Sequence, residues 1–349
     1  MTLKTYETGE VIFYSTDRKQ KINTTIILTV GIIFLLFSIC LSVSIGAADI
    51  NLSVVLDALL QFDPENKAHQ IIWELRLPRT IGAIMVGASF AVAGAIMQGM
   101  TRNDLAEPGL LGLNAGGVFA LALCLAFAPN LSYLMMVFIA FIGAGLGATL
   151  VFGIGSMSAG GITPIRLVLA GAAVSALLTA LSEGVALYYQ IGQDLAYWFA
   201  GGVSTTTWEQ LKVIAPIVIG AIIIAFVLSR AITLLSLGED IALSLGQKTS
   251  QIKLLATVIV LILAGTSVTV VGAVGFIGLI IPHITRLLVG VDYRYIIPCS
   301  AVLGGLLVVY ADVAARLINP PYETPLGALI AVIGVPFFLY LAHTRKGAI

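Results

Sequence analysis

Long apolar runs separated by short polar turns dominate the chain. An α-helix needs about twenty apolar residues to cross the roughly 30 Å of hydrocarbon in a bilayer. Charges, prolines and asparagines cut the sequence into ten runs of about this length, at residues 22–46, 80–101, 109–128, 132–156, 164–188, 211–231, 251–273, 274–290, 297–318 and 325–343. The pattern predicts an all-α, polytopic membrane protein with about ten transmembrane helices, in which a polar tail (1–21) precedes the membrane domain (22–349).

Composition leads to the same class of protein. Hydrophobic residues make up 59% of the chain and charged residues only 10%, whereas a soluble domain carries about 25% charged residues. Mean hydropathy is +1.04, which excludes a soluble enzyme. The net charge is zero and no basic patch is present, so we expect no nucleic-acid partner. Cys40, Cys124 and Cys299 each lie inside an apolar run, and we interpret them as buried small side chains rather than redox groups.

The distribution of lysine and arginine predicts the orientation, because cytoplasmic loops carry an excess of these residues. Ten crossings place both termini on one side of the membrane. That side receives thirteen cations: Lys4, Arg18, Lys19, Lys21, Arg102, Arg166, Arg230, Lys248, Lys253, Arg286, Arg294, Arg345 and Lys346. The opposite side receives five: Lys67, Arg76, Arg79, Lys212 and Arg316. We therefore expect both termini in the cytoplasm, and an odd number of crossings would split this grouping.

Several ordered blocks carry a family resemblance from about residue 22 to residue 345. They read RLPR, GASFAVAGAIMQ and NDLAEPGLLG between residues 76 and 112, then LGEDIALSLG, GFIGLIIPHITRLLVG, ADVAARL and ETPLGALIAVIGVPFFLYL. Together they resemble the FecCD-type permeases, the membrane subunits of ATP-binding-cassette (ABC) importers for ferric siderophores, haem and vitamin B12. The resemblance implies a type II importer architecture and, most specifically, import of a ferric siderophore across a bacterial cell membrane. The blocks do not name the individual substrate.

The same resemblance implies partners. Two ATPase subunits would bind the cytoplasmic face, and a substrate-binding protein would deliver cargo outside. A second permease subunit, identical or closely related, would complete the pathway. The sequence also indicates that ATP is hydrolysed on another subunit. A phosphate-binding loop needs the pattern GxxxxGK[ST], and the Lys248-Thr249 pair lacks the glycines of that pattern. His69, His283 and His343 have no partner at metal-ligand spacing. We therefore expect no enzymatic activity, cofactor or metal site in this chain.

Residues 230–253 form a predicted cytoplasmic loop with one apolar stripe of Leu234, Leu237, Ile241 and Leu245. Gly238 should divide it into two short helices, with Glu239 and Asp240 at a helix N-terminus and Gly246 at a C-cap. Such a stripe suits either an amphipathic helix on the membrane surface or a helix that inserts into a partner groove. The resemblance favours the second, and the predicted ATPase-coupling residues are Leu237, Gly238, Glu239, Asp240, Ile241, Leu245 and Gly246.

Three of the five cations on the outer side are arginines, Arg76, Arg79 and Arg316. Arg76 and Arg79 bracket Pro78, which suits the first turn of a helix, and Arg316 closes the ninth crossing. Each guanidinium could simply extend from a helix end into the interface. In the family that the chain resembles, arginines at the matching positions receive acidic residues of the binding protein. Guanidinium suits that task because it binds carboxylate bidentately. The three are therefore the predicted docking residues.

Polar residues within or near the crossings are few. Glu183 and Asp312 are the main carboxylates, and we place both toward the outer ends of helices, in structural roles. Gln98, Asn103 and Asn114 flank the first turn; they could line a pathway or cap helix ends, and we favour capping. An ion- or proton-coupled secondary transporter is the alternative function, but such folds show inverted repeats and midplane charges. We find no clear repeat between the two halves of the sequence.

Overall fold

The computed structural model describes residues 14–46, 50–157, 164–200, 202–272, 274–320 and 322–344. Within these ranges every regular element is a helix. Seven helices are long and apolar enough to cross a membrane, and three shorter apolar helices accompany them. Each of the ten predicted crossings corresponds to one of these ten helices. The prediction of an all-α membrane protein with about ten crossings is confirmed.

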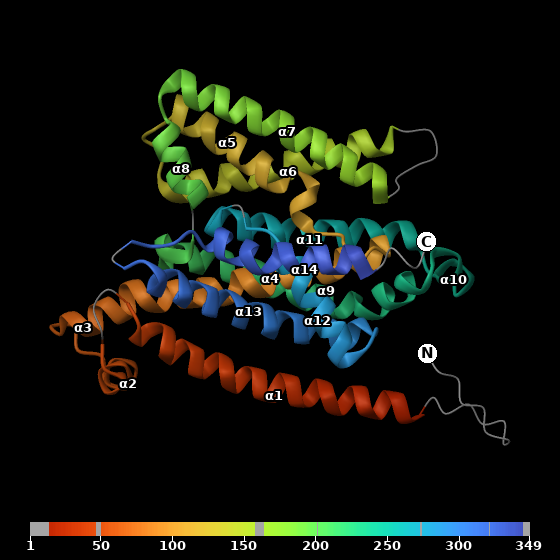
Figure 1. Ribbon diagram of the computed structural model, residues 1–349, viewed down its shortest axis with the longest axis horizontal. Helices are drawn as coiled ribbons and strands as arrows, with labels where there is room; N and C mark the ends of the chain where they lie inside the picture. The colour runs from red at the N-terminus through yellow and green to blue at the C-terminus, as the bar shows by residue number, and fades with distance from the viewer. Residues whose placement is uncertain are drawn as a thin grey trace.

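The crossing helices run alongside one another, and the short connecting helices that are labelled in Figure 1 lie at the two ends. The crossing helices are α1 (Tyr14–Ser44), α4 (Leu77–Thr101), α5 (Leu113–Phe127), α6 (Tyr133–Ser156), α7 (Pro164–Tyr189), α9 (Trp208–Leu237), α11 (Thr249–Val271), α12 (Ile277–Val289), α13 (Tyr293–Ile318) and α14 (Leu326–Thr344). The connecting helices are α2 (Leu52–Leu60), α3 (Lys67–Gln70), η1 (Ile71–Arg76), η2 (Pro108–Leu111), α8 (Gly192–Ala200), η3 (Val203–Thr205) and α10 (Glu239–Ser244). Helices α2, α3 and α8 lie at the predicted outer end, and α10 lies at the opposite end.

Helix α4 occupies the centre of the bundle and is buried over nearly its whole length. It packs against α9, α11, α12 and α13. Its small residues permit this crowding, because Gly87 faces the backbone of Gly304 and Gly94 faces the backbone of Gly278, with no room for a methyl group at either glycine. Small residues allow close backbone approach in lipid, where no hydrophobic force draws helices together. The GASFAVAGA block therefore positions α4 between its four neighbours.

Helices α5, α6 and α7 form a second group beside this centre (Figure 1). Small residues of α5 and α6 meet directly, since Gly116 faces the backbone of Gly143 and Gly147 faces that of Gly112. Helix α1 is peripheral and leaves most of its apolar side chains exposed. Its exposed face is the surface expected for a helix in contact with lipid.

Several helix ends differ from the predicted boundaries. Helix α1 begins at Tyr14 rather than at residue 22, because the polar residues 14–21 continue the helix; residues 1–13 of the predicted tail lie outside the described residues. Helix α9 runs from a capping box at Thr207 and Gln210 to Leu237, well past the predicted end at residue 231. Ile232 and Leu235 are buried beyond Arg230, so one charge does not end the helix. The connection between α9 and α11 is therefore shorter than the predicted loop of residues 230–253, and it contains one short helix, α10, rather than two.

Candidate functional site

The three predicted docking arginines meet where α4 begins and α13 ends. Asp312 lies between two of them and is only 2% exposed. The Nη2 of Arg79 lies 2.8 Å from Asp312 Oδ1, and the Nη2 of Arg316 lies 3.0 Å from Asp312 Oδ2. A single buried carboxylate thus joins the first turn of α4 to the last turn of α13. We call Arg76, Arg79, Arg316, Asp312 and Glu323 the arginine cluster.

Arg76 and Arg316 hold the C-terminal end of α1. Both donate to backbone carbonyls within residues 42–45, with Arg76 Nη1 2.7 Å from Val43 O and Arg316 Nη1 2.6 Å from Ile45 O. The last carbonyls of a helix have no partner within the helix, and a cation there also meets the negative end of the helix dipole. Arg76 is only 8% exposed. These guanidiniums are therefore bonded to protein and do not simply extend into the interface.

Arg79 also has an outward-facing carboxylate partner. Its Nη1 lies 2.5 Å from Glu323 Oε1, and the Glu323 side chain is 45% exposed. Glu323 precedes α14 in the connection from α13, and the neighbouring Thr324 donates its N–H to Ala315 O. Glu323 is the most exposed member of the cluster.

The predicted coupling segment at the opposite end is a rigid helical corner. Gly238 separates α9 from α10 with φ of +142°, a backbone conformation that favours glycine. Helix α10 ends in a Schellman motif, in which Gln247 N–H donates to Ala242 O and Gly246 N–H donates to Leu243 O. Gly246 has φ of +78°. Both glycines therefore have the conformational role that the sequence predicted.

The side chains of this corner divide by polarity. Leu237, Ile241 and Leu245 are exposed, while Asp240 lies in the first turn of α10. Glu239 accepts a hydrogen bond of 2.7 Å from Lys253 Nζ, and this bond lowers the pKa of Glu239 below its ordinary value. The corner thus presents an apolar ridge on a scaffold fixed by the Lys253 pair and by two glycines. That the ridge binds an ATPase stays a prediction.

A polar network beside this corner was not predicted from the sequence. Gln98, 1% exposed, donates to Gly278 O at 3.0 Å and accepts from Arg286 Nη2 at 2.5 Å. Arg286 also pairs with Asp104 at 3.2 Å. Gln98 therefore bridges α4 and α12, and its predicted helix-capping role is wrong because the partners come from another helix. Gln98 ends the GASFAVAGAIMQ block and Arg286 lies in the GFIGLIIPHITRLLVG block. These two positions were the available signals in the sequence.

Glu107 is the second group that the sequence analysis missed. Its carboxylate accepts the backbone N–H of Phe276, the residue that precedes α12 and has φ of +68°. Phe276 in turn packs against Gly334 of α14. Burial raises the pKa of Glu107 above its ordinary value, and the Phe276 hydrogen bond opposes that effect. The turn after α4 is thereby fastened to the start of α12.

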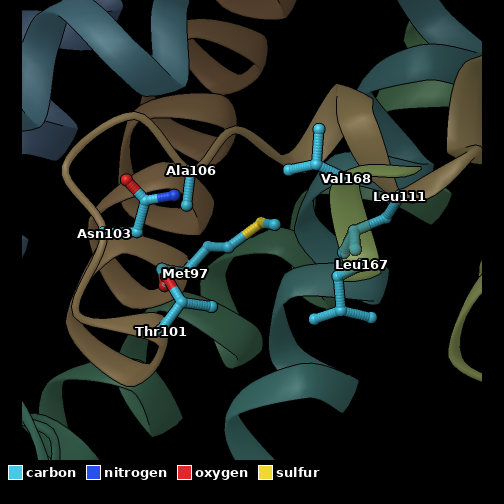
Figure 2. Close-up of a pocket in the computed structure, with 7 residues that line it drawn as sticks. All are labelled: Met97, Thr101, Asn103, Ala106, Leu111, Leu167 and Val168. Atoms are coloured by element: carbon cyan, nitrogen blue, oxygen red, sulfur yellow. Dashed lines mark hydrogen bonds between the residues drawn. The ribbon is translucent and has the colours of Figure 1, made fainter. Parts of the chain in front are cut away.

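A shallow hollow opens where this turn faces α7 (Figure 2). Its lining is mostly apolar: Met97, Thr101, Asn103, Ala106, Leu111, Leu167 and Val168. Asn103 Oδ1 accepts the N–H of Leu105 at 3.0 Å, which fixes the turn locally instead of capping a helix. The Oδ1 of Asn114 is buried and has no hydrogen-bond partner among the described residues, so its predicted capping role is also wrong. The hollow is a seam between helices and holds no reactive group.

The remaining candidates from the sequence are the cysteines and the histidines. All three cysteines are free thiols. The ring of His283 packs edge-on against Phe337, with 5.6 Å between ring centroids. Among the described residues no three or more His, Cys, Asp or Glu side chains gather closely enough to hold a metal ion.

Comparison with known proteins identifies the family to which this chain belongs. Residues 34–344 match the model of the FecCD transport family. The chain is 52% identical over 326 residues to the iron(3+)-hydroxamate import system permease protein FhuB of Bacillus subtilis, covering 93% of this chain and 84% of the relative. It is 44% identical over 324 residues to the iron-uptake system permease protein FeuB of the same organism, covering 93% and 97%. A metal-chelate-type ABC transporter solved in an inward-facing conformation superposes with a TM-score of 0.79 at 29% identity, covering 91% of this chain and 99% of that one.

Proposed function

Because this chain belongs to the FecCD transport family, we propose that it is the translocation subunit of an ABC importer for ferric siderophores of the hydroxamate class. The observation that carries the proposal is the 52% identity, over 93% of the chain, to a permease named for iron(3+)-hydroxamate import. The bundle of ten apolar helices around α4 supports a path through the membrane. It holds no group suited to catalysis among the described residues.

Uptake by cells tests the substrate class. The gene is deleted, and accumulation of radioactive iron is measured from ferric hydroxamate, ferric catecholate and ferric citrate. The proposal expects loss of hydroxamate uptake alone, and restoration by a plasmid copy of this chain. Retained hydroxamate uptake, or loss confined to the citrate or catecholate complex, would refute the assignment of substrate.

The ATPase subunits would bind at α10. The ridge of Leu237, Ile241 and Leu245 is exposed, apolar and held on a rigid corner, which suits a helix that inserts into a groove of a partner. A preorganised ridge also loses little conformational freedom when it binds. The excess of cations on this side supports its placement in the cytoplasm, together with both termini. The protein would then span the cell membrane many times, beside a second identical or related permease subunit.

The binding protein would dock at the arginine cluster. Arg76 and Arg316 mainly support α1, so Arg79 provides the contact and Glu323 occupies its outward side in the undocked chain. A carboxylate of the binding protein could replace Glu323 bidentately and leave Arg79 paired. Such an exchange would fix register and speed association more than it would add affinity.

Exchanging Glu323 for lysine tests docking without touching the buried pair. Glu323→Lys should tighten binding-protein affinity at low salt, and the gain should shrink at high salt because rim charges are screened. Glu65→Lys, an exposed change of equal charge in the connection between α2 and α3, controls for general attraction. An equal gain from both variants, or none from Glu323→Lys, would count against docking at the cluster.

A further inference from the structure

Helix α2 (Leu52–Leu60) lies outside the crossing helices and carries an apolar stripe that no described part of the chain covers. Leu52, Leu56, Leu59 and Leu60 occur at i, i+4, i+7 and i+8 and therefore share one face. All four are exposed. Asp57, the only charged residue of the helix, is turned about 100° away from Leu56. The exposed stripe thus has a defined direction.

The orientation of this stripe is fixed by the protein. Val55 and Ala58 are fully buried in a small outer core with Val43 of α1 and Ile72 of η1. The indole N–H of Trp73 donates to Ala58 O at 2.7 Å, one of the last carbonyls of α2, which have no partner within the helix. These contacts leave α2 little freedom to turn its leucines inward.

The surroundings of α2 indicate what covers the leucines. In Figure 1 α2 lies at the outer end of α1, on the same peripheral side of the bundle, and is seen nearly end-on while α1 runs across the view. The apolar face of α1 is exposed along its length, through Ile33, Leu36 and Phe37, and meets lipid because α1 crosses the membrane. The outer core that joins α2 to α1 through Val43 therefore places the leucine stripe next to a helix whose exposed face meets hydrocarbon. Half-buried Trp73 and Trp208 stand behind the stripe, as interfacial tryptophans do.

We propose that α2 lies in the plane of the outer leaflet and inserts Leu52, Leu56, Leu59 and Leu60 among the acyl chains. An amphipathic helix in this position anchors by its buried apolar area. Asp57 then faces the headgroups and water. The leucine face of α2 is then not part of the footprint of a docking protein. The proposal does not depend on the identity of the transported substrate.

Site-specific photocrosslinking identifies the neighbour directly. Benzoylphenylalanine is incorporated at Leu56 or Leu60 in the intact chain, within cell membranes and in the presence of its partners. Asp57 is the matched control on the adjacent face. Leu36, on the lipid-facing side of α1, is the positive control. After irradiation, mass spectrometry of the purified protein distinguishes phospholipid adducts from protein adducts.

The expected result is a phospholipid adduct at Leu56 and Leu60 that is comparable to the Leu36 yield and at least several-fold above the Asp57 yield. Leu60 ends the helix, so its variant tests the proposal even if the Leu56 variant fails to fold. Crosslinking of the leucine positions to a binding protein or to a second copy of this chain would overturn the proposal. Lipid yields at both leucine positions no higher than at Asp57 would overturn it as well.

Discussion

Neutralising Asp312 should destabilise the protein far more than neutralising Glu323, although both carboxylates pair with Arg79. Asp312 is 2% exposed and separates two guanidiniums, at 2.8 Å from Arg79 and 3.0 Å from Arg316. Asp312→Asn keeps the size of the side chain but leaves these two cations facing each other. Removing one partner of a buried ion pair costs about 3–5 kcal/mol.

The pair between Glu323 and Arg79 is not buried in the same way, because the Glu323 side chain is 45% exposed. Exposed ion pairs contribute about 0–1 kcal/mol, so Glu323→Gln is the matched control. At about 2 °C per kcal/mol, the lower end of the range for domains of 150–250 residues, Asp312→Asn should lower Tm by about 6–10 °C. The control should lower it by no more than about 2 °C.

The assay is thermal unfolding of the purified chain in lipid nanodiscs, followed by intrinsic tryptophan fluorescence. Each variant is compared with the unsubstituted chain in one lipid composition, so that the bilayer contribution is constant. Equal Tm shifts for Asp312→Asn and Glu323→Gln would refute the reasoning, because burial would then make no difference to the two pairs.

Three further predictions follow from contacts elsewhere. Gly94→Ala should sharply lower Tm and folded yield because its methyl group would meet backbone of α12, whereas Gly145→Ala has open space and should change stability by no more than about 1 kcal/mol, in the stabilising direction. Glu107→Ala should cost about 1–3 kcal/mol by leaving a buried N–H without its acceptor; Glu107→Gln keeps an acceptor. Burial raises the pKa of Glu107, so ionising this carboxyl group lowers the stability of the fold as pH rises above its ordinary pKa. The Glu107→Gln variant cannot ionise there, so its Tm should not show this decrease when melts are recorded over a series of pH values. Ile241→Asp should abolish co-purification with the ATPase and transport, but not membrane insertion. Leu243 is the matched control, because it is 53% exposed where Ile241 is 49% exposed and lies on the other side of α10. Leu243→Asp should leave both co-purification and transport intact.

Local signals in the sequence predicted the parts of this structure that local physics decides. Ten apolar runs became ten helices, and Gly238 and Gly246 became the positive-φ corners of α10 because glycine tolerates that backbone. The ends were less predictable, as the extension of α9 past Arg230 shows. A helix end depends on what its last turn packs against, and that information is not local.

The arginine cluster shows what the sequence could not supply. Arg79 and Asp312 are far apart in the chain, and no local pattern indicates that they meet. The sequence analysis placed Asp312 near an outer helix end in a structural role, but its pairing with two arginines required the packing of α4 on α13. The carbonyl partners of Arg76 and Arg316 on α1 were invisible for the same reason. Glu107 was missed because a turn carboxylate gives no sign of the N–H it will accept.

The source of energy for uptake tests the central claim most directly. The chain is purified with its ATPase and binding protein, reconstituted into proteoliposomes, and supplied with radioactive ferric hydroxamate. We predict accumulation that requires ATP on the ATPase side and persists when an ionophore collapses the proton gradient. Accumulation driven by an imposed proton gradient without ATP would contradict the account and establish a secondary transporter instead.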